Sequence, residues 1–380
     1  MKICAIICEY NPFHNGHLHQ LREAKRLSGA DAVICLMSGN FVQRGEAAII
    51  HKYARARHAV LAGADVVIEL PTVFATSNAE LFAKGGIHIL RSIPDVETLC
   101  FGAENADKLA FISAARYLND EPKEVSDKIK EYTANGNSYA KARANAWAGF
   151  IPLDLLSSPN NILGLEYTKA LLSSHSNISI LPIPRVGKGY KDGELQENFS
   201  SASAIRTAIE NGTDFSNNIP DYVYQDCPKK FENSLDSLEK IAVLNTSTQD
   251  LRLVCDCTEG LENAFQKAAS SNESFVDALT SSRYTSARIR RIGLQNLLKI
   301  REPLIRDCLQ SPLYLRVLAA NKNAKEVLLT LSKANIPVLT RGTDAQSLSG
   351  IAKECFEKDV YAEKIHSILY GEVTDKKIFI

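Results

Sequence analysis

The sequence lacks the long apolar runs of membrane proteins, since no run approaches the roughly 18 residues that span a bilayer. Its first apolar run is short and leads directly into Glu9 and His14, unlike a signal peptide. An excess of one charge is also missing over the whole chain, because 44 Lys and Arg balance 44 Asp and Glu. We therefore expect a cytoplasmic protein with no membrane partner.

The cysteines lack the arrangement of a disulfide framework or a zinc site. There are nine, an odd number, and several lie inside apolar runs, as Cys4, Cys35 and Cys100 do. Cys255 and Cys257 form one close pair, but no second pair lies nearby at the spacing of zinc ligands. We expect reduced core cysteines, no disulfide partner and no metal site.

Strand-like and helix-like segments alternate through the first half of the 380 residues, a length typical of two or three domains. This alternation predicts an α/β fold with a Rossmann-like parallel sheet and right-handed crossovers. The expected strands are Ile3–Cys8, Ala32–Met37, Val66–Leu70, Val96–Phe101 and Ile178–Ile183. The expected helices are His17–Leu27, Ile49–Ala62, Ser77–Arg91 and Asn161–Ser173.

The second half of the chain shows a different pattern. After about Tyr224 no strand–helix alternation persists, and leucine-rich helical patterns such as Leu294–Ile305 dominate. The stretch Asn105–Phe150 predicts two or three helices inserted before the last strand. We expect a first domain over 1–224, with its helical insertion at about 105–150, and a mainly α-helical second domain over 225–380.

The first strand ends in a polar turn that carries His14 and His17. The helical spacing after His17 places both histidines on the first turn of a helix, on one face. That turn offers free N–H groups and the positive end of the helix dipole to an anion, and Gly16 lets the backbone approach a ligand. An H-x-G-H pattern after a strand is typical of nucleotidyltransferases and class I synthetases, which attack the α-phosphate of ATP. We assign His14 and His17 to that phosphate and its leaving oxygens.

A second polar segment opens another predicted helix after the last strand. Ser201 and Ser203 can cap this helix and donate to phosphate, and Arg206 can offer its guanidinium fork to the β- or γ-phosphate. Polar or glycine-rich residues also follow the other strands, where ligands of open α/β sheets collect. Among them, Arg44 is a candidate for contact with a small carboxylate or phosphate, as is Lys52 on the following helix.

The neutral total hides a local charge asymmetry. From Asp226 to Thr280, 5 basic residues stand against 10 acidic ones, whereas from Arg283 to Arg341 there are 12 against 3, a balance of +9. Such an excess favours a polyanionic partner, above all nucleic acid. Candidate RNA contacts are Arg283, Tyr284, Arg288 and Arg291. The last three share one side of a helix, with the tyrosine ring able to stack on an unpaired base. The alternative is that these arginines pair with the preceding acidic stretch.

Several blocks together resemble the bacterial tRNA(Met) cytidine acetate ligases, a family of HIGH-type nucleotidyltransferases. The match spans residue 3 to about 320, and His51 departs from it by standing where an acidic residue is expected before Lys52. The region beyond Val317 matches less clearly. The blocks are Glu9–His17, Gly39–Glu46, Phe101–Gly102, Ser158–Tyr167, Ser201–Arg206 and Arg283–Ile289.

The resemblance implies that ATP, with Mg²⁺, activates acetate as acetyl-adenylate. The acetyl group then passes to the wobble cytidine of elongator tRNA(Met), giving 4-acetylcytidine, AMP and pyrophosphate. It implies an ATP-binding first domain, a tRNA-binding second domain, and a nucleotide site made of Ile7, Cys8, Glu9, Tyr10, Asn11, Pro12, Phe13, His14, Asn15, Gly16, His17, Leu18, His19, Gln20, Gly102, Asn161 and Arg185.

Two other functions stay open at this stage. The chain is alternatively an adenylyltransferase for another small metabolite, with a second domain that serves oligomerisation. It is otherwise a non-catalytic tRNA-binding protein with a vestigial nucleotide fold. The basic segment from Arg283 to Arg341 argues against the first alternative, and the intact pair His14 and His17 argues against the second.

Overall fold

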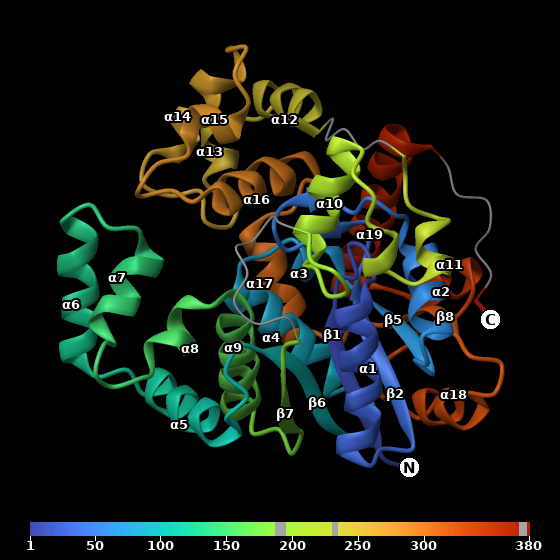
Figure 1. The fold of residues 1–380 in the computed structure, drawn as a ribbon. Coiled ribbons are helices and arrows are strands. Elements are labelled where there is room, and N and C mark those ends of the chain that lie inside the picture. Colours follow the sequence, from blue (N-terminus) through green and yellow to red (C-terminus); the bar gives the residue numbers. More distant parts are fainter. Residues whose placement is uncertain (187–194, 230–234, 372–377) are drawn as a thin grey trace.

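The computed structural model describes residues 1–186, 195–229, 235–371 and 378–380 (Figure 1). Within them a central sheet has the strand order β7-β6-β1-β2-β5-β8-β9. The first five in this order are parallel, β8 runs antiparallel to β5, and β9 is parallel to β8. The bounds are β1 Ile3–Cys8, β2 Ala32–Ser38, β5 Val66–Leu70, β6 Val96–Ala103, β7 Ser179–Pro184, β8 Leu315–Ala320 and β9 Val338–Leu339. The α/β class and the five expected strands are confirmed.

Every residue of β1, β2 and β5 is buried, as expected of parallel strands with helices on both faces. Alternate side chains of β1 enter two cores: Ile3 and Ala5 face one cluster, Cys4 and Ile6 the other. The first core is covered by α3 Thr72–Ala75, α4 Ala79–Leu90, α9 Pro159–Ser173, α17 Glu302–Gln310 and α19 Gly350–Tyr370. The second is covered by α1 Asn15–Ser28, α2 Lys52–Leu61, α10 Ala202–Asn211 and α11 Asp221–Tyr224.

The insertion after β6 is helical, as expected. Its helices reach away from the sheet, as the left-hand side of Figure 1 shows. Tyr132 of the second helix and Ala144 of the third pack against the core that Trp147 helps to form. The helices are α5 Lys108–Asn119, α6 Lys123–Ala134, α7 Tyr139–Ala146 and α8 Leu153–Ser157.

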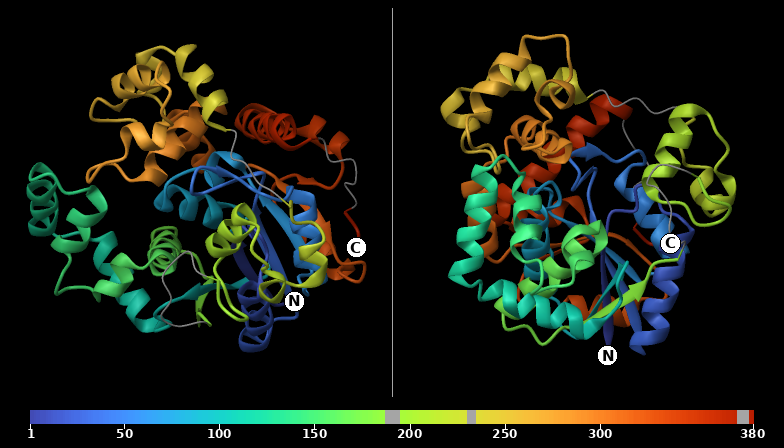
Figure 2. Two further views of the ribbon diagram at one scale, coloured as in Figure 1. Left: turned by 45° about the horizontal axis from the view of Figure 1, so that its top comes forward. Right: turned by 60° about the vertical axis from the view of Figure 1, so that its left-hand side comes forward.

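Five helices between residues 235 and 297 form what we call the helical bundle. Phe265, Phe275 and Ile289 belong to a small core of their own there, separate from the two cores of the sheet. Figure 2 shows the bundle standing beyond one end of the sheet. Its helices are α12 Leu235–Leu244, α13 Thr248–Leu251, α14 Leu261–Ala269, α15 Phe275–Leu279 and α16 Ser286–Leu297.

The expectation that no strand–helix alternation persists after Tyr224 is wrong. The chain returns from the helical bundle to the sheet as β8, which pairs with β5 through Val317 and Ala319, and adds β9 and α18 Lys325–Leu331. The β8 run is short and apolar, and periodicity alone does not distinguish such a run from a buried helical segment. The residues after 310 therefore belong with the sheet rather than with a separate helical domain.

The pattern Leu294–Ile305 is also divided in the structure. Helix α16 ends at Leu297, Lys299 adopts a left-handed conformation with φ 55°, and α17 begins at Glu302. Two remaining strands, β3 Phe41–Val42 and β4 Glu46–Ala47, form a small antiparallel hairpin, and short 3-10 turns cover Ser216–Asn218 and Gly342–Ser347. No helix in the described ranges combines the length and the apolar character needed to cross a membrane.

Candidate functional site

A cavity of about 770 Å³ lies at the carboxyl ends of β1, β6 and β7, where ligands of open parallel sheets bind. The β3–β4 hairpin and the first turns of α1, α9, α10 and α16 complete its wall, so the sheet and the helical bundle share it. The predicted residues that line it are Ile7, Cys8, Glu9, Tyr10, Asn11, His14, Gly16, His17, His19, Gln20, Arg44, Gly102, Arg185, Ser201, Ser203, Arg206 and Arg291.

The two histidines are locked together at the start of α1. His14 is the N-cap in extended conformation, and its Nδ1 accepts from the Gly16 N–H at 3.1 Å. The His14 N–H donates to Nδ1 of His17 at 3.3 Å, and the two rings stack with centroids 3.6 Å apart. Because each Nδ1 accepts from a backbone N–H, each Nε2 carries the ring hydrogen and remains available as a donor.

Both imidazoles are neutral in the free protein. Burial lowers the pKa of His14 to about 3, with the nearby Arg185 guanidinium adding to the effect. Burial, the neighbouring His14 ring and Arg185 lower the pKa of His17 well below its usual value. The pair therefore supplies directed N–H donors, and the positive charge of the cavity comes from Arg185, Arg206, Arg44 and Arg291.

The structure explains why residue 16 is glycine, which the sequence alone did not. A Cβ at this position would lie 2.9 Å from Cε1 and 3.0 Å from Nδ1 of His14. Glycine thus leaves room for the His14 ring to fold over the helix start and cap it. The same absence of a side chain keeps the first turn open to a ligand, as the sequence predicted.

Asn11 and Arg206 bring a second set of donors to the cavity. Asn11 is buried, its Oδ1 accepts from the Ile49 N–H at 2.9 Å, and its Nδ2 has no hydrogen-bond partner in the structure. Arg206 donates from Nη1 to the Asn11 carbonyl at 2.9 Å. Ser201 caps α10, as predicted, and its hydroxyl lies 2.9 Å from that of Ser203. These donors suit an anion with several oxygens.

Gly102 stands at the end of β6, next to β1, where a Cβ would make ordinary contacts with Cγ of Arg185 at 3.7 Å and Cδ of Gln20 at 4.0 Å. Arg185 is 43% exposed and lies 3.9 Å from the Glu104 carboxylate. Asn161, by contrast, is fully buried behind the wall, where its Oδ1 accepts from the Glu104 and Asn105 N–H groups. It holds this turn in place, and its neighbour Asn160 lines the cavity instead.

Four residues of the predicted Ile7–Gln20 stretch stand outside the cavity wall. Phe13 is fully buried against Tyr10, and Asn15 donates to the carbonyls of Asn198 and Asn217 at 3.0 and 2.8 Å. Pro12 and Leu18 do not line the cavity either. They shape the turn from behind.

Lys52 is placed away from the cavity, contrary to its candidacy for contact with acetate or phosphate. Its ammonium lies 2.7 Å from Glu69 and 3.1 Å from Glu363, and the side chain is 1% exposed. Arg316 on β8 pairs with the same two carboxylates at 3.0 and 3.3 Å. This buried network joins α2, β5, β8 and α19, so Lys52 holds the sheet and the C-terminal helix together.

His51, which departs from the family pattern, is the N-cap of α2 and is neutral. Its Nδ1 accepts from the Tyr53 N–H at 3.4 Å, and its Nε2 lies 3.1 Å from Asn40 Nδ2. Burial lowers its pKa to about 3, and the nearby His366 adds to the effect.

The depressed pKa of His51 predicts a loss of stability in acid. The unfolded chain protonates this group near pH 6.5, so the stability due to neutral His51 is present above that pH and is lost as the pH falls toward 3. Between pH 7 and pH 5 we expect wild type to lose about 2 kcal/mol more than His51→Asn, which keeps the cap. Urea unfolding at both pH values measures this, and equal losses would refute it.

The arginines of α16 are largely engaged within the helical bundle. Arg288 donates to the Asp256 carbonyl at 2.8 Å and to Thr258 Oγ1 at 2.9 Å, and Arg291 lies 3.6 Å from the Asp256 carboxylate. Tyr284 lies beside Arg288, 5.1 Å from guanidinium to ring centroid, as predicted. Arg283 lies 3.1 Å from the Glu259 carboxylate. The acidic stretch thus pairs with Arg283, Arg288 and Arg291, which is the alternative that the sequence left open.

The basic segment from Arg283 to Arg341 is not one surface. Arg316 on β8 is 14% exposed and pairs with Glu69, and Lys325 begins α18, which lies at the opposite end of the molecule from α16 (Figure 1). These charges are close together in the sequence, but they lie far apart in the structure because the chain returns to the sheet after α17. Arg283 remains 48% exposed despite its ion pair with Glu259, and Arg44 on the hairpin turn is also exposed.

Sequence reasoning missed several lining residues that the fold brings in. Gln43 and Glu46 come from the hairpin, Glu104 from the end of β6, and Thr285 from the N-cap of α16. The block Gly39–Glu46 resembles the family, but a strand of two residues is too short to show the alternation of apolar and polar residues that identifies a strand. The position of α16 against the cavity depends on tertiary packing alone.

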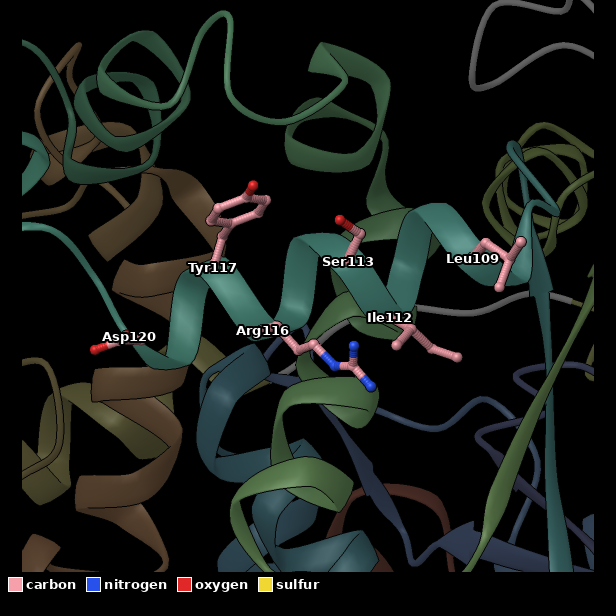
Figure 3. Close-up of a pocket in the computed structure, with 6 residues that line it drawn as sticks. All are labelled: Leu109, Ile112, Ser113, Arg116, Tyr117 and Asp120. Atoms are coloured by element: carbon pink, nitrogen blue, oxygen red, sulfur yellow. The ribbon is translucent and has the colours of Figure 1, made fainter.

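Two other features carry no chemistry of this kind. A shallow depression of about 570 Å³ lies along α5, and Leu109, Ile112, Arg116 and Tyr117 are spread along this helix (Figure 3). Cys255 and Cys257 are buried, and burial raises the pKa of each thiol to about 12. Nowhere in the described residues do three His, Cys, Asp or Glu side chains gather as a metal site would require.

Comparison with known proteins gives a consistent result over the full length. The family model described as HIGH Nucleotidyl Transferase matches residues 1–378. The tRNA(Met) cytidine acetate ligases of Thermoanaerobacter sp. (strain X514) and Alkaliphilus metalliredigens are 38% and 36% identical, each over 97% of this chain and over 96% and 94% of their own. The crystal structure of Thermotoga maritima TmcAL bound with alpha-thio ATP covers all of both chains, with 29% identity and a TM-score of 0.87. Its apo form gives 30% and 0.90.

Proposed function

The chain belongs to the HIGH nucleotidyl transferase family, and we propose that it is an ATP-dependent ligase that acetylates the wobble cytidine of elongator tRNA(Met). The stacked pair His14 and His17 at the start of α1 carries this proposal, because two fixed donors face a cavity rich in arginine. Relatives over 30% identical that bear this name support the choice of substrates. The cytoplasm, where tRNA is found, is the proposed location.

The histidines act by positioned hydrogen bonds. Nε2–H of His14 and of His17 donate to the α-phosphate and to the oxygens that leave with pyrophosphate, and the first turn of α1 lies beneath them. Their neutral state suits this role, since a fixed N–H donor needs no proton transfer as charge grows. The free Nδ2 of Asn11 and the fork of Arg206 meet the outer phosphates.

The remaining nucleotide contacts come from the ends of β6 and β7 and from α10. Gly102 leaves room for the base or ribose, Arg185 holds the phosphates from the far side, and Ser201 and Ser203 offer hydroxyl donors. Mg²⁺ fits as an ion that arrives with the nucleotide and keeps its water, because the described residues form no dedicated cage.

Activation of acetate explains why the protein needs no nucleophile of its own. The exocyclic amine of cytidine is conjugated with its ring and does not attack acetate at a useful rate. The acetate carboxylate therefore attacks the α-phosphorus and displaces pyrophosphate. The resulting mixed anhydride then acylates the amine, which loses a proton as AMP leaves. The protein positions the reactants and balances charge, with Arg44 and Arg291 as proposed contacts for acetate or the nucleic acid.

The shared cavity wall distinguishes this proposal from a metabolite adenylyltransferase with an oligomerisation domain. Thr285, Ala287 and Arg291 of the helical bundle line the same cavity as the histidines. The bundle is thus part of the candidate site, and we propose that it carries the tRNA-binding function expected of residues 225–380.

Pyrophosphate exchange tests the proposed first step. When acetate is present, labelled pyrophosphate should exchange into ATP. The exchange is measured with and without elongator tRNA(Met), since tRNA can complete the site. Exchange that depends on acetate supports the formation of acetyl-adenylate. Exchange with phosphate metabolites but not with acetate would identify a different adenylyltransferase.

Two exposed arginines should contribute to tRNA binding. We expect the double variant Arg44→Gln and Arg283→Gln to weaken tRNA binding and to lower the slope of log K against log salt by about 0.7 for each lost phosphate contact. Arg288→Gln is the matched comparison, because Arg288 is only 18% exposed and its bonds to Asp256 and Thr258 predict a lower melting temperature instead. An unaltered salt slope in a folded double variant would refute this placement of the tRNA.

A further inference from the structure

The β3–β4 hairpin connects the end of β1 to the helical bundle. Its Gln43 N–H donates to the Glu9 carboxylate at 2.7 Å. At its turn, Gly45 has φ 76°, and a Cβ there would lie 2.6 Å from the backbone nitrogen of Arg291. The hairpin backbone therefore touches the α16 backbone at a distance that only glycine permits.

Glu46 on this hairpin bridges two arginines from distant parts of the chain. Its Oε2 lies 3.3 Å from Nη2 of Arg206, and its Oε1 lies 2.9 Å from Nη1 of Arg290 on α16. The Glu46 side chain is 18% exposed and lines the cavity. One carboxylate thus holds an arginine of the candidate nucleotide site and an arginine of the helical bundle.

We propose that Glu46 is a positioning residue that couples nucleotide binding in the cavity to the placement of the helical bundle. This inference rests on the proposed function, in which the cavity takes ATP and the bundle takes tRNA. Phosphate oxygens compete with Glu46 for the Arg206 guanidinium. When Arg206 turns to the phosphate, the Glu46 carboxylate is repelled by the ligand and attracted by Arg290 alone, which presses the hairpin against α16.

The consequence is positive coupling between two ligands. Nucleotide binding favours the bundle position in which the hairpin and α16 are in contact, and tRNA binds this position. Nucleotide therefore raises the affinity for tRNA, and tRNA raises the affinity for nucleotide by the same factor. If the two ion pairs instead serve stability alone, their loss lowers the melting temperature and leaves this coupling intact.

Titration of labelled elongator tRNA(Met), with and without saturating ATP and in the absence of acetate, measures the coupling. For wild type we expect ATP to tighten tRNA binding by about fivefold or more, the lower end of usual allosteric couplings. For Glu46→Gln we expect less than about twofold. The ATP affinity of Glu46→Gln without tRNA should be unchanged or higher, because a negative charge has left the phosphate site.

Two further variants separate coupling from charge and from folding. Arg290→Gln removes the other half of the bridge and should abolish coupling with ATP affinity unchanged. Glu104→Gln removes a cavity carboxylate that bonds Asn160 and Asn161 on α9, and it should keep the coupling. Wild-type coupling in folded Glu46→Gln, or none in wild type, overturns the inference. Failure of wild type to acetylate tRNA overturns the proposed function, whatever the coupling.

Discussion

Replacing His14 with Asn should lower the rate of tRNA acetylation about 10²–10³-fold, about 3–4 kcal/mol of transition-state stabilisation. The reason is the loss of one fixed donor, Nε2–H, beside the α-phosphate. Asn is a good N-cap, so it can accept from the Gly16 N–H as His14 does and should leave the melting temperature unchanged. His14→Ala loses the cap as well and should destabilise the protein by about 1 kcal/mol in addition.

Initial rates and thermal melts of the two His14 variants, with His17→Ala, check this prediction. His175→Asn is the matched control, because His175 is exposed in the turn after α9 and its φ of 50° is one that Asn tolerates. A His14→Asn variant that acetylates tRNA at the wild-type rate would remove His14 from the catalytic assignment.

Lys52→Met should cost about 3–5 kcal/mol of unfolding free energy, because it leaves Glu69 and Glu363 buried with one cation fewer. The KM values for ATP and acetate should not change in the folded variant, since Lys52 lies outside the cavity. Urea unfolding and steady-state kinetics measure the two effects. Lys25→Met is the control: Lys25 is 49% exposed and 3.9 Å from Asp65, so its loss should cost under about 1 kcal/mol.

A stable Lys52→Met variant with a raised KM for acetate would restore the contact that the sequence suggested. It would also mean that Arg316 alone balances the two carboxylates. The two measurements therefore decide between an anchor of the C-terminal helix and a substrate ligand.

Local patterns predicted much of the fold and the site. Short apolar runs flanked by helical periods identified β1, β2 and β5, because fully buried parallel strands are continuous in apolar residues. The histidine motif was sufficient for the start of α1, since capping and the anion site depend on neighbours within four residues. Ser201 as a cap of α10 follows the same local chemistry.

Long-range pairing is what the sequence did not reveal. In the sequence, a basic residue such as Lys52 or Arg288 looks the same whether its side chain meets solvent, substrate or a buried carboxylate. Glu363 and Asp256 become their partners only when α19 packs against the sheet and the bundle closes on its own core. The strand β8 was missed for a related reason, because its pairing with β5 is set by tertiary contacts and not by its own period.

Nucleoside analysis of elongator tRNA(Met) incubated with the protein, ATP and labelled acetate tests most directly whether the histidine cavity acetylates cytidine. We expect the label in 4-acetylcytidine at the wobble position, and only when ATP is present. With His14→Asn, the initial rate of labelling should fall by the same factor as the rate of acetylation. No label in that nucleoside with wild-type protein that binds both ATP and tRNA(Met), or equal initial rates of labelling by wild type and His14→Asn, would contradict it.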